Sequence, residues 1–385
     1  MIKANVILDY PKWIISIVSI ITVVMLLFAS QLEMNFSIEE LFALNDPDVE
    51  KYFDFIEEFD REDNLIFLMY ECDDPFSYDN LYLNKLLVEK FESIKGVDEV
   101  TSLSNLQIFT DGGDELFRSV YPYIPLSKVS LLDAKDRIIS SELVQETLIS
   151  RDGKLSSFAI ELNESFNNHD MREKIVKEID VYQDSVNWIW HQSGIPILRT
   201  RYVQLMVADT IRFLIPVAIM IVILFSVIFR SWLALLVPMS IIIMVVIWTM
   251  GLMASVQIDF NIMTYIIPTL LFIIGIGDSV HFLVKYYGTL SDIKDKRKAL
   301  SQTIEKIGTA IFLTSITTSI GFGSLIRSNI DIVRQFGMMT AAGVMFAFIL
   351  TVTYLPAMIM LFKQTPIKKL KSYSCLLYTS DAADE

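Results

Sequence analysis

The stretch Ile266-Ile267-Pro268-Thr269-Leu270-Leu271-Phe272-Ile273-Ile274-Gly275-Ile276-Gly277-Asp278-Ser279-Val280-His281 carries the strongest indication of fold class in the chain. Its apolar part is long enough to form most of a membrane-spanning helix. A carboxylate inside such a helix costs about 2.5–3.5 kcal/mol on insertion scales, so it rarely lacks a function. We therefore expect Asp278 to face a bundle interior or a water-filled path, and to carry protons or ions.

The composition indicates a membrane protein with a soluble part. The chain has 385 residues, of which 53% are hydrophobic, and its mean hydropathy is +0.46. Residues 31–209 hold 36 acidic and 16 basic residues, whereas the remainder has more bases than acids. An acidic soluble part argues against nucleic acid as a partner. Two cysteines and three histidines without ligand spacing predict neither a disulfide framework, nor a metal site, nor a cofactor.

Six apolar segments each approach or exceed the roughly 20 residues needed to cross a bilayer. They predict six membrane helices, at Trp13–Ser30, Phe213–Phe229, Trp232–Val256, Ile262–Tyr286, Ile307–Ile326 and Phe336–Phe362. Residues 1–32 would hold the first span, 33–209 the soluble domain, 210–365 the other five spans and 366–385 a tail.

Lysine and arginine placement predicts the orientation of these spans. Basic residues precede the first span, cluster between the fourth and fifth, and follow the sixth, as in Lys12, Lys294–Lys298 and Lys363–Lys371. Placing all of them in the cytoplasm puts the N-terminus inside and residues 33–209 outside. The predicted location is therefore the inner (plasma) membrane, with a periplasmic or other extracytoplasmic domain.

The soluble domain alternates between strand and helix patterns. The expected order is strand, helix, strand, strand, helix, strand, at Asn64–Tyr70, Tyr78–Ile94, Val97–Leu103, Lys154–Leu162, Asp170–Ser185 and Asn187–His191. This is the split βαβ, or ferredoxin-like, α+β pattern, with residues 111–150 as an insert. The acids scatter over helix surfaces, so we predict no catalytic constellation here.

Three residues near Asp278 bear on its role. Gly275 and Gly277 would let another helix come close, and His281, one turn later, would extend a proton path or hold the carboxylate. Counted from Ile262 at 1.5 Å per residue, Asp278 lies about 24 Å along the helix, inside the hydrocarbon and toward its cytoplasmic half. The alternative is that Asp278 lies near the inner boundary and reaches water. His281 would then be satisfied by water or backbone.

The fifth span carries hydroxyl residues on one helical face, namely Thr314, Thr317 and Thr318, together with Gly321. These hydroxyls could line water or hydrogen-bond a carboxylate. Alternatively, they bond back to carbonyls of their own helix, as is common in membranes. We expect a supporting role for this face in the relay.

The order of one span, a large outer domain and five spans resembles the half-unit of the resistance-nodulation-division (RND) superfamily. Gly275–His281 resembles the fourth-helix motif of its predicted-exporter branch, which is similar to MMPL-like hydrophobe and lipid exporters. Further resemblances occur elsewhere in the chain, at Phe36–Phe42 with Asn45-Asp46-Pro47, Thr317-Thr318 with Gly321-Phe322, Phe336-Gly337 and Leu355-Pro356-Ala357. The resemblance implies that Asp278 is the proton relay.

The chain departs from the RND pattern in two ways. Many relatives carry two adjacent acids where this chain has Asp278 followed by Ser279, and full members repeat the unit to give twelve spans. We therefore expect this chain to be an N-terminal half whose partner is a missing C-terminal half-unit, with a homo-oligomer also possible. Residues 374–385 fit nothing before them and resemble translated adapter sequence.

Three functions remain in competition. The first is an exporter, driven by the proton-motive force, that moves a hydrophobic or lipid-like substrate out of the bilayer. The second is an intramembrane aspartyl protease, which would need a second membrane aspartate; the spans offer none, so we expect no enzyme. The third is a non-transporting sterol- or lipid-sensing module, which would tolerate loss of Asp278.

Overall fold

The computed structural model describes residues 4–35, 41–42, 47–59, 64–109, 117–119, 135, 138, 148–166, 168–229 and 231–362. Most of the predicted insert 111–150, part of the Phe36–Phe42 motif, and the whole tail 366–385 with its terminal 374–385 segment lie outside these residues. The chain divides into two compact units, Glu50–Leu205 and the combination of Met1–Val49 with Met206–Glu385. The domain boundaries at residues 33 and 209 stay predictions.

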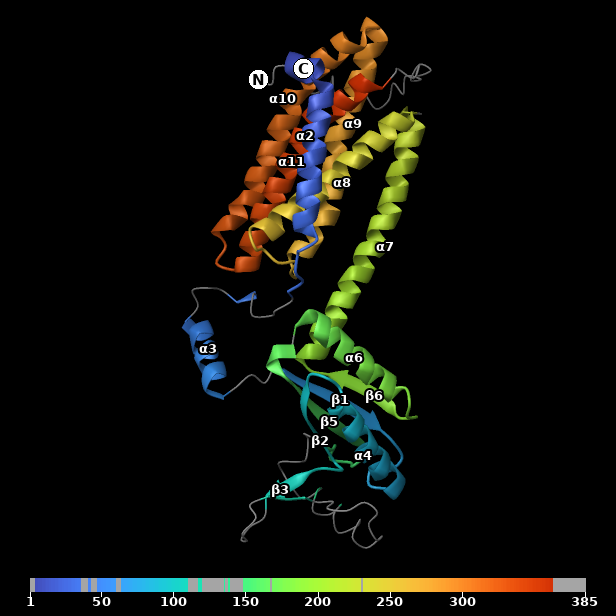
Figure 1. The fold of residues 1–385 in the computed structure, drawn as a ribbon, viewed down its shortest axis with the longest axis vertical. Coiled ribbons are helices and arrows are strands. Elements are labelled where there is room, and N and C mark those ends of the chain that lie inside the picture. The colour runs from blue at the N-terminus through green and yellow to red at the C-terminus, as the bar shows by residue number, and fades with distance from the viewer. Residues whose placement is uncertain are drawn as a thin grey trace. The chain divides into compact units, whose positions relative to one another are not determined.

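The unit formed by the two chain ends is helical (Figure 1). Within the described part, six helices are long and apolar enough to cross a membrane, as predicted. They are α2 (Pro11–Ala29), α7 (Ile195–Phe229), α8 (Trp232–Ser255), α9 (Ile267–Ile293), α10 (Lys296–Gly323) and α11 (Asp331–Leu361). The short helix α1 (Ala4–Asp9) precedes them, and the 3₁₀ turns η4 (Thr264–Ile266) and η5 (Ser324–Arg327) adjoin α9 and α10.

Two helices begin well before their apolar segments. Helix α7 starts at Ile195 rather than Phe213, and α10 starts at Lys296 rather than Ile307. Hydropathy marks only the part of a helix that suits hydrocarbon, whereas backbone hydrogen bonding continues into polar sequence. The start of α10 is set by Asp295, whose carboxylate accepts a hydrogen bond from the backbone N–H of Lys298 at 3.0 Å.

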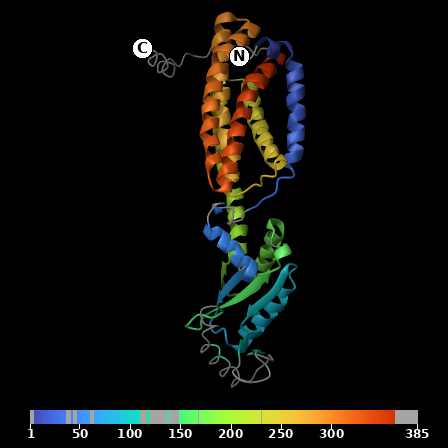
Figure 2. The ribbon, with the colours of Figure 1, turned by 90° about the vertical axis from the view of Figure 1, so that its left-hand side faces the viewer.

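Helices α2, α8, α9, α10 and α11 lie side by side as a bundle (Figures 1 and 2). Helix α2 packs closely on α8, because a Cβ added at Gly251 would collide with the backbone of Met25. Nearby, the indole Nε1 of Trp248 donates to the Thr22 hydroxyl at 2.9 Å. The N-terminal helix is therefore an integral part of the bundle, despite the long stretch of sequence before α8.

Chain segments from different parts of the sequence meet at the two ends of this bundle. At one end the backbone N–H of Phe260 donates to the carbonyl of Glu33 at 2.8 Å. At the other end Arg297 forms an ion pair with Asp9. The segments expected outside thus share one end, and those expected inside share the other. Which end faces the cytoplasm stays a prediction.

The second unit contains a four-stranded antiparallel sheet with strand order β2-β5-β1-β6. The strands are β1 (Leu65–Glu71), β2 (Val97–Ser102), β5 (Leu155–Leu162) and β6 (Ile189–Ser193). Every second residue of β1 is buried, at Ile66, Leu68 and Tyr70, which is the alternation of a sheet with one covered face. Helices α4 (Tyr78–Glu92) and α6 (His169–Gln183) share a core cluster with these residues.

The predicted order of elements in this unit is therefore present, with each end shifted by at most a few residues. The remaining elements are α3 (Pro47–Phe59), the paired strands β3 (Gln107–Phe109) and β4 (Phe117–Ser119), and the turn η3 (Glu164–Phe166). Assignment of the unit to the ferredoxin-like class, and its place outside the cytoplasm, stay predictions.

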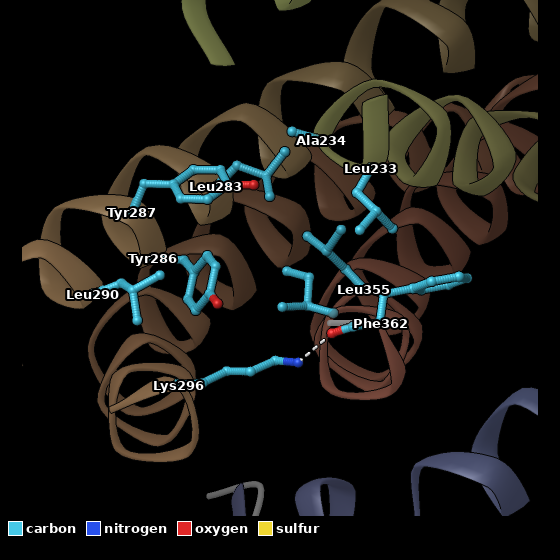
Figure 3. A pocket seen from close by; sticks show the side chains of 10 residues that line it. Leu233, Ala234, Leu283, Tyr286, Tyr287, Leu290, Lys296, Leu355 and Phe362 are labelled. Carbon is cyan, nitrogen blue, oxygen red and sulfur yellow. Dashed lines mark hydrogen bonds between the residues drawn. The ribbon is translucent and has the colours of Figure 1, made fainter. Parts of the chain in front are cut away.

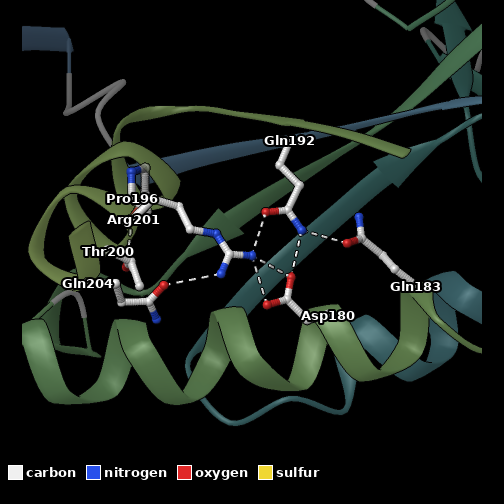
Figure 4. Close-up of polar contacts among 7 residues, drawn as sticks. All are labelled: Asp180, Gln183, Gln192, Pro196, Thr200, Arg201 and Gln204. Carbon is white, nitrogen blue, oxygen red and sulfur yellow. Dashed lines mark hydrogen bonds and ion pairs between the residues drawn. The ribbon is translucent and has the colours of Figure 1, made fainter. Parts of the chain in front are cut away.

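A polar cluster joins the first turns of α7 to α6 and β6 (Figure 4). The Nη2 of Arg201 lies 2.8 Å from both carboxylate oxygens of Asp180 and 3.1 Å from the side-chain oxygen of Gln192. The Gln192 amide in turn donates to Asp180 at 2.7 Å and to Gln183 at 2.6 Å. A charged network with several hydrogen bonds holds geometry better than an isolated surface pair, so this cluster explains why α7 already begins in this unit.

Candidate functional site

Asp278 lies near the middle of α9, about 16 Å beyond Ile267 at 1.5 Å per residue. Its carboxylate is half-buried, and the Ser315 hydroxyl of α10 lies 3.4 Å from Oδ2. That distance exceeds the 2.5–3.0 Å usual for an O–H···O hydrogen bond, so the contact is weak. No lysine or arginine within the described ranges forms an ion pair with Asp278. The carboxylate is therefore held loosely, without a compensating cation.

The two glycines before Asp278 have different surroundings. A Cβ added at Gly275 would lie 3.7 Å from Cγ1 of Ile242 on α8 and 3.8 Å from Cβ of Ala347 on α11. These are ordinary contact distances, so Gly275 sits where three helices meet, although an alanine would also fit. A Cβ at Gly277 would meet nothing within 4 Å among the described atoms. Gly275 therefore belongs to the packed interior and Gly277 to an open side.

His281 lies one turn beyond Asp278 and is exposed. In the part of the chain that the structure describes, its ring makes no hydrogen bond. The structure thus places His281 at the surface of the bundle near the carboxylate, rather than between Asp278 and a second polar group.

The three predicted threonines of α10 do not reach Asp278. Their hydroxyls donate to carbonyls of their own helix, from Thr314 to Ile311 at 2.9 Å, from Thr317 to Leu313 at 2.9 Å, and from Thr318 to Thr314 at 2.8 Å. The sequence left two interpretations open, and in the structure the hydroxyls bond to carbonyls of their own helix rather than to a carboxylate. These hydroxyls use their protons locally, which is the common behaviour of Ser and Thr in membrane helices.

The two serines of the same segment, Ser315 and Ser319, face the bundle instead. Ser315 is 3% exposed and contacts Asp278, and Ser319 donates from its buried hydroxyl to the Ala341 carbonyl of α11 at 3.0 Å. Both were missed from the sequence. The sequence feature that could have identified them is their spacing. Gly308, Ser315 and Ser319 form a line of small residues on one helical face, where a neighbouring helix can approach.

Further hydroxyls lie inside the bundle next to this site. Ser279 of α9 and Thr351 of α11 are fully buried, and neither hydroxyl has a hydrogen-bond partner among the described residues. Each lies one turn beyond the contact between Gly275 and Ala347, and α9 and α11 run in the same direction. They therefore lie at a similar level of the bundle, and the bundle interior at the level of Asp278 contains unused donors.

Comparison with known proteins agrees with this architecture. A sequence model described as the MMPL family matches residues 77–374. The "Putative membrane protein MJ1562" of Methanocaldococcus jannaschii is similar to this chain, with 29% identity over 133 residues. That similarity covers 34% of this chain and 34% of the archaeal protein, so the matched part spans about a third of the relative.

Proposed function

This chain belongs to the MMPL family, within the RND superfamily of membrane transporters, and we propose that it exports a hydrophobic or lipid-like substrate, driven by the proton-motive force. The observation that carries the proposal is the loosely held, half-buried Asp278 in the middle of α9. A carboxylate in an ion pair stays ionised, whereas one without a cationic partner can bind and release a proton. Such residues in membrane spans commonly serve as proton relays.

Protonation would change how α9 and α10 interact at this site. An ionised Asp278 can only accept a hydrogen bond, and the Ser315 hydroxyl is placed to donate one. A protonated carboxyl gains a donor of its own, so the hydrogen bond between Asp278 and Ser315 can then run from the carboxyl to the serine hydroxyl. The unused hydroxyls of Ser279 and Thr351 offer further donors at this level of the bundle interior. We propose that α9 and α10 have two packing arrangements, and that the protonation state of Asp278 determines which of the two is favoured.

A partner unit completes the proposed transporter. Gly277 and Gly321 have open space at their Cβ positions, and His281 is exposed one turn beyond Gly277. This side of α9 and α10 is where we propose that a second six-span unit packs, either as the continuation of a longer chain or as a second copy. Its small residues suit close helix contact.

Export of an amphipathic probe from reconstituted vesicles tests the function. With a fluorescent phospholipid equally distributed between the two leaflets, we expect net movement only under an imposed pH gradient, and we expect that movement to stop when a protonophore dissipates the gradient. The second six-span unit is included by co-expression where the longer gene supplies it. Movement at the same rate with and without the gradient would contradict proton coupling.

The serine and threonine faces of α10 give a matched pair of variants. Ser315→Ala removes the hydroxyl next to Asp278 and is expected to slow export by about fivefold, since one weak bond to a charged group contributes roughly 1 kcal/mol. Thr317→Val removes a hydroxyl bonded within its own helix and should leave the rate near that of the parent. Initial export rates at equal protein content are the measurement, and a larger loss for Thr317→Val would overturn this assignment.

Labelling from outside the cell tests the proposed orientation. Glu89 is exposed on α4, so a cysteine there should react with an impermeant maleimide in intact cells at pH 7.5. The native thiol interferes little, because burial and the neighbouring Asp74 raise the pKa of Cys72 to about 11 and only the thiolate reacts. Cys375 is replaced by serine. Labelling that requires permeabilised cells would place the unit inside.

A further inference from the structure

A small pocket opens at the end of the bundle that carries Arg297 and Asp9, away from Asp278. Its walls come from α8, α9, α10 and α11, and they are mostly aliphatic and aromatic, including Leu283, Leu290, Leu355 and Ile359. Figure 3 shows three polar groups around this space, the Lys296 ammonium and the hydroxyls of Tyr286 and Tyr287. An apolar cavity with a few converging polar groups has the general character of a ligand site.

The Lys296 ammonium supplies the charge of the pocket. Its Nζ donates to the carbonyls of Met360 at 3.0 Å and Phe362 at 2.6 Å, at the end of α11. An ammonium has three N–H donors, so one remains after these two bonds. Helix α11 thus positions the ammonium at the rim of the pocket, where a further acceptor can reach it.

The N-terminus of α8 adds a second positive feature. Leu233 and Ala234, in its first turn, line the pocket. The residue before the helix, Ser231, makes no side-chain hydrogen bond to the helix end, and its hydroxyl is hydrogen-bonded with Tyr287. The first backbone N–H groups of a helix lack partners within the helix, and they attract negative charge.

The Tyr286 hydroxyl is the observation that points to a ligand. The side chain is 2% exposed, and Figure 3 shows its oxygen directed into the pocket on the side of Lys296. Within the ranges that the structure describes, nothing hydrogen-bonds to this hydroxyl. Buried tyrosine hydroxyls usually have a partner, so an acceptor bound in the pocket would satisfy it.

We propose that this pocket binds the phosphate group of an anionic membrane phospholipid. A cavity of about 30 Å³ has room for one or two water-sized groups, which suits phosphate oxygens rather than an acyl chain. The membrane-spanning helices around the pocket would lie against the acyl chains of such a lipid in the bilayer, which a free anion does not have. The exposed Lys294 and Arg297 add attraction for an anionic bilayer surface at this end.

Lipid binding to the purified full chain in detergent tests the proposal. Native mass spectrometry counts bound phosphatidylglycerol and phosphatidylcholine at matched concentrations, and we expect phosphatidylglycerol to be retained preferentially. Tyr286→Phe removes one hydroxyl and no hydrogen bond of the folded chain, so it should fold normally. It should weaken phosphatidylglycerol binding by about tenfold, as expected for loss of a hydrogen bond to a charged group.

The charge variant has a matched control. Lys296→Met should weaken binding at least as much as Tyr286→Phe, whereas Lys298→Met removes the same charge from an exposed position outside the pocket lining and should change it little. Because Lys296 also binds the end of α11, Tyr286→Phe is the decisive variant. Unchanged phosphatidylglycerol binding in Tyr286→Phe would overturn the proposal. Displacement of the bound lipid by an equal concentration of inorganic phosphate would also overturn it, in favour of a free-anion site.

Discussion

Replacing Asp278 by asparagine is expected to lower gradient-driven export by roughly a hundredfold or more, to the leak rate of the vesicles, as for loss of a positioned proton-transfer group. Asparagine keeps the size of the side chain and can still accept a hydrogen bond from Ser315, but it cannot take up a proton. A neutral amide costs less to bury in a membrane than a charge, so insertion and folding should be unaffected. Export rate at equal protein content is the measurement.

The control for this variant is Asp292→Asn, which makes the same change at an exposed position near the end of α9. We expect it to export at the parent rate. Export by Asp278→Asn at the parent rate would contradict a relay at this position. If the parent itself exports nothing, and both proteins change conformation equally on adding lipid, the lipid-sensing alternative is favoured.

The second large effect is expected on stability rather than on transport. Gly251→Val places a branched side chain where even a Cβ collides with the backbone of Met25, so α2 must move away from α8. Overpacking of this kind costs about 1–3 kcal/mol, and the hydrogen bond between Trp248 and Thr22 should be lost as well. We expect the thermal unfolding midpoint in detergent to fall clearly below that of the parent.

Gly288→Ala is the matched control, because a Cβ at Gly288 meets nothing within 4 Å in the described part of the chain. It adds a methyl group to a helix without displacing a neighbour, so its unfolding midpoint should stay at or slightly above that of the parent. Equal midpoints for Gly251→Val and the parent would show that α2 is not held against α8 in this way.

Hydropathy was sufficient to predict the six spans, because a bilayer requires long uninterrupted apolar segments and internally satisfied backbone. The start of α7 could not be found in the same way. Its first turns include charged residues that interrupt the apolar pattern, and they are held by the Arg201 and Asp180 cluster, which is a tertiary interaction. The strand order of the sheet likewise depends on pairing between β1 and β5, whose residues are far apart in sequence.

The candidate site was predicted in part. Asp278 was identifiable because a charge inside an apolar run is conspicuous in one dimension. Its neighbour Ser315 was not, because Thr314–Ser319 offers hydroxyls on every side of the helix, and only packing against α9 and α11 selects the face that turns inward. The pocket with Tyr286, Lys296 and Phe362 combines residues from α8, α9, α10 and the end of α11, and nothing local in the sequence brings them together.

Proton movement driven by substrate is the most direct test of the account. Vesicles containing the transporter are loaded with a pH-sensitive dye, and a gradient of the amphipathic substrate is imposed with no initial pH difference. The account predicts that substrate movement drives protons the opposite way with the parent protein, and that Asp278→Asn shows no such movement. Equal proton flux in the two proteins would contradict the relay role of Asp278.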